Sequence, residues 1–89
     1  DVYRSDYKQS HHDDLLALAK GKPIALGEVG QIPTPEILAS QPKWAWYMPW
    51  GWIHVTYNDP ELIKKMMNLQ QVLTLDEISV DAAGNYEVK

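Results

Sequence analysis

One short apolar run does most to restrict the fold of this chain. Residues 22–30 read KPIALGEVG, an apolar segment bounded by Pro23 and Gly30. Because it is apolar at successive positions, it predicts a strand buried on both faces, as in a parallel sheet. A second strand is expected in KWAWYM, residues 43–48, where Pro49 and Gly51 end it. Helical segments around these strands would give βα alternation, which indicates the α/β class.

Three segments carry helix signals. The first is predicted over residues 11–20, with Ser10 as the start and Gly21 as the stop. A short second helix is predicted over residues 35–40, because Thr34 precedes a proline at the first helical position.

The third predicted helix follows Asp59 as N-cap and Pro60. Its apolar face is formed by Leu62, Ile63, Met66, Met67 and Leu69. Beyond it, the segments 78–80 and 86–88 with a Gly-Asn turn signal between them predict a small hairpin.

Composition excludes several classes of partner. A chain of 89 residues fits one small domain or part of a larger one. Its formal charge of −4 and its lack of a basic stripe argue against nucleic acid. No apolar run approaches the roughly 20 residues of a membrane span, and the absence of cysteine excludes disulfides and thiolate metal sites. The run HHDD, residues 11–14, is interpreted as a solvated first turn of a helix. We therefore expect no metal and no cofactor.

The aromatic residues are unevenly placed. All four tryptophans lie in WAWYMPWGW, residues 44–52, and the chain has five tyrosines but no phenylalanine. Tryptophan and tyrosine suit surfaces that meet both water and an amphipathic ligand, but they also fill cores. Within the strand, Trp44 and Trp46 are expected to be core.

The carboxylate at the end of the first strand is the strongest candidate for chemistry. Strict alternation would place Ile24, Leu26 and Glu28 on one face, with small residues on the other leaving room for a helix. Glu28 would then point inward at the carboxyl edge, where α/β folds place their active sites. The second strand delivers Trp50 to the same edge. Alternatively, Glu28 caps a neighbouring helix or pairs with Arg4.

Taken together, KPIALGEVG, WAWYMPWG and the upstream DVYRSDY resemble the last third of the catalytic domain of family 26 glycoside hydrolases, chiefly endo-β-1,4-mannanases. The resemblance covers residues 1 to about 75. It implies a (β/α)8 TIM barrel of the clan A type, in which this chain supplies strands seven and eight and their helices. Residues 76–89 are then a C-terminal extension.

The resemblance also implies roles for individual residues. Glu28 is the nucleophile, Tyr3 hydrogen-bonds it, and Trp50 lies beneath the sugar that is cleaved. From their positions after the second strand, Trp52 and His54 are further candidates for substrate binding, and Trp52 alternatively only covers the mouth of the barrel. The family's acid/base is a Glu at the end of strand four, to which no residue here corresponds, so the remainder of the barrel is the expected partner. Because retention needs two carboxyl groups, we predict that the chain alone is inactive.

The function implied is a retaining endo-acting hydrolase of β-1,4-mannan, and relatives act on β-1,3-1,4-glucan or β-1,3-xylan. A non-catalytic carbohydrate-binding module and a structural α/β fragment remain alternatives. The resemblance implies a secreted, periplasmic or cell-surface location. The sequence itself shows neither signal peptide nor initiator methionine, so an internal or trimmed piece is expected.

Overall fold

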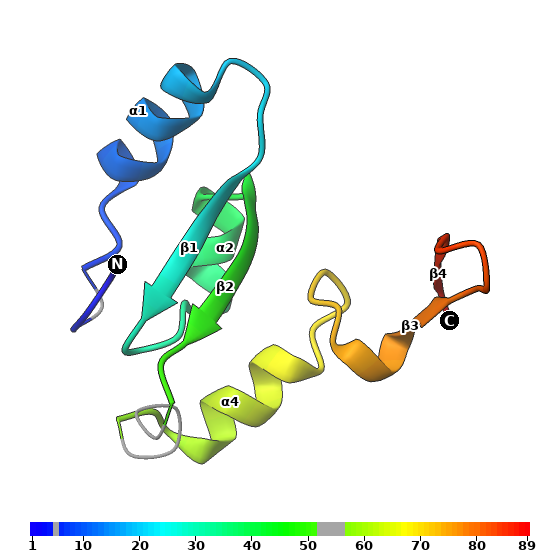
Figure 1. Ribbon diagram of the computed structural model, residues 1–89. Helices are drawn as coiled ribbons and strands as arrows, with labels where there is room; N and C mark the ends of the chain where they lie inside the picture. The colour runs from blue at the N-terminus through cyan, green and yellow to red at the C-terminus, as the bar shows by residue number, and fades with distance from the viewer. Residues whose placement is uncertain (5, 52–56) are drawn as a thin grey trace.

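The computed structural model describes residues 1–4, 6–51 and 57–89. Figure 1 shows their arrangement along the chain. The first part contains the predicted alternation of helices and strands: α1 (Gln9–Ala19), β1 (Ile24–Val29), α2 (Pro35–Ser40), β2 (Trp44–Pro49) and α4 (Pro60–Met67). The last part contains a 3-10 turn and two short strands: η1 (Leu75–Glu77), β3 (Ile78–Val80) and β4 (Tyr86–Val88).

β1 lies at the centre of a small parallel arrangement. It pairs with β2 in parallel, which confirms the predicted parallel sheet, and α2 lies behind the two strands in Figure 1. On its other edge β1 forms a parallel bridge between Val29 and Val2. The backbone hydrogen bonds agree with this arrangement. Val2 bonds to Glu28 and Gly30, whereas Trp50 bonds to Val29 between them. Alternate residues of a strand form their backbone hydrogen bonds on opposite edges, so Val2 and Trp50 lie on opposite sides of β1. Three parallel segments therefore lie side by side.

The register of β1 corrects the strict alternation expected from the sequence. Ile24 and Leu26 are buried, with 6% and 4% of their surface exposed, and Val29 is fully buried. Gly27 is exposed, and a Cβ built on it meets nothing within 4 Å. The pairing shifts between Leu26 and Val29, so two residues of β1, Gly27 and Glu28, oppose one residue of β2. The buried face is thus that of Ile24 and Leu26, and the bulge keeps Glu28 off it.

Two of the three predicted helix starts are confirmed. The Thr34 hydroxyl accepts a hydrogen bond from the Ile37 N–H (3.2 Å), and the Asp59 carboxylate accepts one from the Glu61 N–H (3.0 Å). Each cap is followed by proline at the first helical position. The prediction for α1 is wrong in detail, because the N-cap is Lys8 with no side-chain hydrogen bond.

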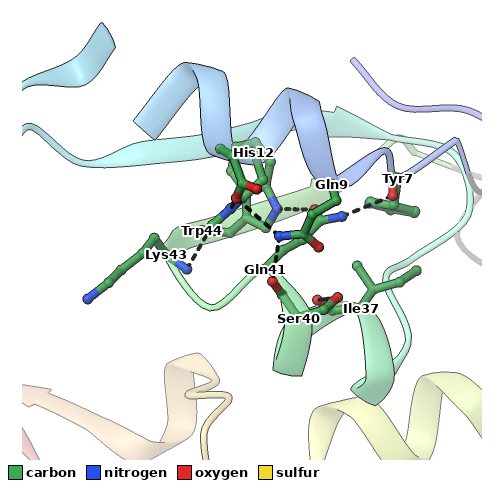
Figure 2. Close-up of polar contacts among 9 residues, drawn as sticks. Tyr7, Gln9, His12, Ile37, Ser40, Gln41, Lys43 and Trp44 are labelled. Atoms are coloured by element: carbon green, nitrogen blue, oxygen red, sulfur yellow. Dashed lines mark hydrogen bonds and ion pairs between the residues drawn. The ribbon is translucent and has the colours of Figure 1, made fainter. Parts of the chain in front are cut away.

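The HHDD run is only partly the solvated turn expected. His12 is buried, with 3% of its surface exposed, and its ring meets Trp44 edge to face at 5.3 Å. The Lys43 N–H donates to His12 Nε2 (3.2 Å), so the ring proton lies on Nδ1, which contacts Asp13 Oδ1 at 2.8 Å. Figure 2 shows how this histidine joins α1 to the beginning of β2. Its role here is packing.

Trp44 and Trp46 differ in burial, although the sequence predicts both to be in the core. Trp44 is half-buried and its Nε1–H donates to Gln41 Oε1 (2.8 Å), while Gln41, itself 2% exposed, donates to the Tyr7 carbonyl (2.9 Å). Trp46 is 56% exposed, so its core assignment is wrong for the described residues. It lines an apolar groove along β2, together with Leu38 of α2 and Met67 of α4.

We expect Trp44→Ala to lower the free energy of unfolding of the full-length protein by about 3 kcal/mol. The change removes the ring against His12 and leaves the buried Gln41 oxygen without its donor. The free energy of unfolding is measured by urea denaturation, with circular dichroism as the signal. Asp14→Ala, at an exposed polar position of α1, is the control and should cost less than about 0.5 kcal/mol. Equal losses in the two variants would contradict the packing role.

The C-terminal residues form the predicted hairpin. β3 and β4 pair antiparallel, with Ile78 opposite Val88, and the Asp81 carboxylate accepts from the Asn85 N–H across the turn (2.9 Å). Among the helices of the described residues, none has the length and apolarity that crossing a bilayer requires.

Candidate active site

Glu28 stands at the carboxyl end of the central strand. It is the penultimate residue of β1, is half-buried, and belongs to the bulge that keeps it off the packed face. Bulges beside functional sites commonly redirect one side chain in this way. The backbone around it is held on both edges, by Val2 on one side and Trp50 on the other.

Tyr3 brings its phenol to this carboxylate. The Val2 N–H donates to the Glu28 carbonyl (2.9 Å) and the Gly30 N–H donates to the Val2 carbonyl (2.9 Å), so residue 3 leaves the sheet beside the end of β1. The Tyr3 hydroxyl donates to Glu28 Oε1. The contact matches the one implied for Tyr3 by the resemblance, whereas its role in catalysis stays a prediction.

The same contact shifts the titration of Tyr3. Its hydrogen bond to Glu28 raises the pKa of the phenol above the usual 10.0, and desolvation and the negative charge of Glu28 act in the same direction. The phenol therefore remains a protonated donor to the carboxylate at higher pH than an ordinary tyrosine would.

Trp50 follows the neighbouring strand at the same end. Its backbone N–H donates to the Val29 carbonyl (3.0 Å), and its side chain is 49% exposed. Since β1 and β2 are parallel neighbours, Glu28 and Trp50 occupy one edge, as expected. That their side chains face a common hollow stays a prediction. Trp52 and His54 lie outside the described residues.

Two residues near Glu28 were not expected from the sequence. Asn58 is buried, with 8% of its surface exposed; its Oδ1 accepts from the Ile32 N–H (2.8 Å) and its Nδ2 donates to the Gly30 carbonyl (2.9 Å). Gly30 carries the Tyr3 ring against its α-carbon. The second glycine of GEVG is visible in the sequence, where it marks only the end of the strand, and a lone loop asparagine gives no signal.

In the part of the chain that the structure describes, the Tyr3 hydroxyl donates to the Glu28 carboxylate, and the two groups form a polar pair at the end of β1. In residues 1–4, 6–51 and 57–89, no three histidine, aspartate or glutamate side chains gather as ligands for a metal ion. A carboxylate at a strand end that accepts a hydrogen bond from a phenol can act chemically as a nucleophile or as a general base.

Comparison with known proteins identifies the family. No protein-family model matches the chain. A mannan endo-1,4-beta-mannosidase of Thermothelomyces thermophilus is 38% identical over 74 residues, which cover 78% of this chain and 15% of that protein. The solved structure of GH26A from Muricauda sp. superposes with a TM-score of 0.85 and 52% identity, covering 89% of this chain and 26% of the other. The chain thus spans about a quarter or less of each relative. These relatives support a fragment of a family 26 glycoside hydrolase, and the match to GH26A supports the TIM-barrel fold for the parent family.

Proposed function

We propose that this chain carries the nucleophile half of the active site of a retaining endo-β-1,4-mannanase. The observation that carries the proposal is the Tyr3 hydroxyl on the Glu28 carboxylate, at the carboxyl end of parallel strands and next to Trp50. Active sites of TIM barrels lie at this end of the strands. The mannosidase named among the relatives supports the substrate.

In this proposal β1 and β2 are the seventh and eighth strands of the barrel, and Val2 is the end of the sixth. The support is the order of three parallel segments, in which successive βα units lie side by side. Residues 1–75 belong to the barrel, and residues 76–89 are an extension that includes the β3–β4 hairpin. The enzyme acts outside the cytoplasm, where polysaccharide is degraded.

The reaction proceeds in two steps. Glu28 attacks the anomeric carbon while a second carboxyl group, about 5–5.5 Å away in retaining enzymes, protonates the leaving oxygen. The bond formed is a glycosyl ester of Glu28, and the leaving group departs as an alcohol. Water, deprotonated by the second carboxyl group, then cleaves the ester. Tyr3 orients Glu28 before the attack, and the rest of the barrel supplies the acid/base.

The covalent step gives a direct test. A mannobiosyl fluoride with fluorine at C2 slows breakdown of the glycosyl ester, so incubation with the full-length enzyme should label one peptide, and mass spectrometry should place the label on Glu28. Reducing ends released from mannan, β-1,3-1,4-glucan and β-1,3-xylan identify the substrate. A label on another carboxylate would refute the assignment.

We expect Trp50→Ala to lower kcat about 100-fold while substrate affinity falls much less, because a ring beneath the distorted sugar acts mainly in the transition state. Steady-state kinetics on soluble mannan oligosaccharides give kcat. Calorimetry on the inactive Glu28→Gln protein, with and without Trp50→Ala, gives the change in affinity. Trp50→Phe, which keeps a flat apolar face, should recover part of the loss. If affinity and kcat/KM fell equally, Trp50 would contribute uniform binding instead.

A further inference from the structure

The contact between Tyr3 and Glu28 depends on a residue with no side chain. The aromatic ring of Tyr3 lies directly over Gly30: a Cβ built there would stand 2.5 Å from Tyr3 Cδ1 and 3.0 Å from Cε1. Its φ is outside the left-handed range, so the backbone does not require glycine. Space for the ring is therefore the reason that a larger residue does not fit.

Asn58 holds Gly30 in place from the loop that follows β2. Its amide nitrogen donates to the Gly30 carbonyl (2.9 Å), and its amide oxygen accepts from the Ile32 N–H (2.8 Å). Asn58 is buried, with 8% of its surface exposed, so both hydrogen bonds lie away from water. On the opposite side, the Gly30 N–H donates to the Val2 carbonyl (2.9 Å). The peptide groups around Gly30 are thus held from two directions.

We propose that Gly30 and Asn58 are positioning residues that set the Tyr3 hydroxyl on the Glu28 carboxylate. The inference rests on the proposed nucleophile role of Glu28. Asn58 fixes the backbone of Gly30 through its hydrogen bond to the Gly30 carbonyl. Because Gly30 has no Cβ, the Tyr3 ring can lie close to its α-carbon. In this position the Tyr3 hydroxyl reaches Glu28 Oε1. Both residues act through Tyr3 and need not touch substrate.

A double-mutant cycle in the full-length enzyme tests the proposal. Gly30→Ala should lower kcat/KM by about 10- to 100-fold, since displacements near 1 Å can cost that much. In the Tyr3→Phe background the same change should cost less than about twofold, because no hydroxyl remains to be misplaced. Tyr86→Phe is the matched control: Tyr86 is exposed in β4, and in that background Gly30→Ala should keep its full effect.

Asn58→Asp gives a second route, should Gly30→Ala fold poorly. Aspartate keeps the size and the acceptor for Ile32 but replaces the donor to Gly30 with an oxygen. It should lower kcat/KM in wild type and much less in Tyr3→Phe. Circular dichroism verifies folding of each variant.

The titration of Tyr3 supplies a readout that stability alone would not move. With ring-labelled tyrosine, NMR should show that the Tyr3 phenol titrates at a lower pH in Gly30→Ala than in wild type, because the hydrogen bond that raises its pKa is lost. Equal losses of kcat/KM in the wild-type and Tyr3→Phe backgrounds, with the Tyr3 titration unchanged, would overturn the inference. Full activity of Glu28→Gln would instead overturn the proposed function.

Discussion

Glu28→Gln in the full-length enzyme should lower kcat on mannan by about 10⁴-fold or more, the scale on which removal of a nucleophile acts in other hydrolases. Glutamine keeps the shape of the side chain and can still accept from the Tyr3 hydroxyl. It cannot supply the carboxylate that forms the glycosyl ester. Affinity for mannan oligosaccharides, measured by calorimetry, should therefore change little.

A smaller substitution distinguishes the nucleophile from the acid/base. In Glu28→Ala, azide can enter the space left by the carboxylate and attack an activated β-mannoside from the same face, which gives the α-mannosyl azide. Loss of an acid/base would instead give the β-azide, because the enzyme would still invert twice. NMR of the product assigns the anomer. Glu36→Gln, at an exposed carboxylate of α2, is the control and should retain activity.

The 89-residue chain alone should release no reducing ends from mannan. Retention needs two carboxyl groups facing one sugar, and Glu28 is the acidic residue at the carboxyl ends of β1 and β2. Three other carboxylates accept local hydrogen bonds elsewhere in the chain. Asp59 caps α4, Glu77 bonds to Thr74, and Asp81 bonds within the β3–β4 turn. A pair that lacks one member retains little catalysis.

Mixing the chain with a polypeptide that bears the remainder of the barrel should restore turnover. Reducing-end assays on the chain, on the mixture and on the Glu28→Ala chain give the comparison. Turnover by the chain alone, well above that of its Glu28→Ala variant, would show that the acid/base lies within these 89 residues.

Local signals in the sequence predicted much of this fold. The Thr34–Pro35 and Asp59–Pro60 pairs start helices where expected, because a cap depends on residues two or three positions away. The parallel pairing of β1 with β2 followed from apolar runs separated by a helix. Signals of this kind depend on residues close in the sequence and not on contacts with distant segments.

The setting of the candidate site depended on contacts that no local pattern encodes. A period of two assigned Glu28 to the face of Ile24 and Leu26, and the bulge at Gly27 and Glu28 breaks that period. A bulge is a property of two paired strands, so the sequence of one strand does not reveal it. Burial of His12 likewise depends on Trp44, which lies 32 positions further along the chain.

The link between Tyr3 and Glu28 limits how enzymes of this kind can be recombined. Tyr3 precedes α1 and Glu28 lies in β1, so the whole of α1 separates the two residues along the chain. A chimera joined within or just before β1 would take its tyrosine from one parent and its glutamate, Gly30 and Asn58 from the other. Crossover points upstream of Val2 transfer the entire set, so breakpoints for exchanging parts of such enzymes belong before residue 2.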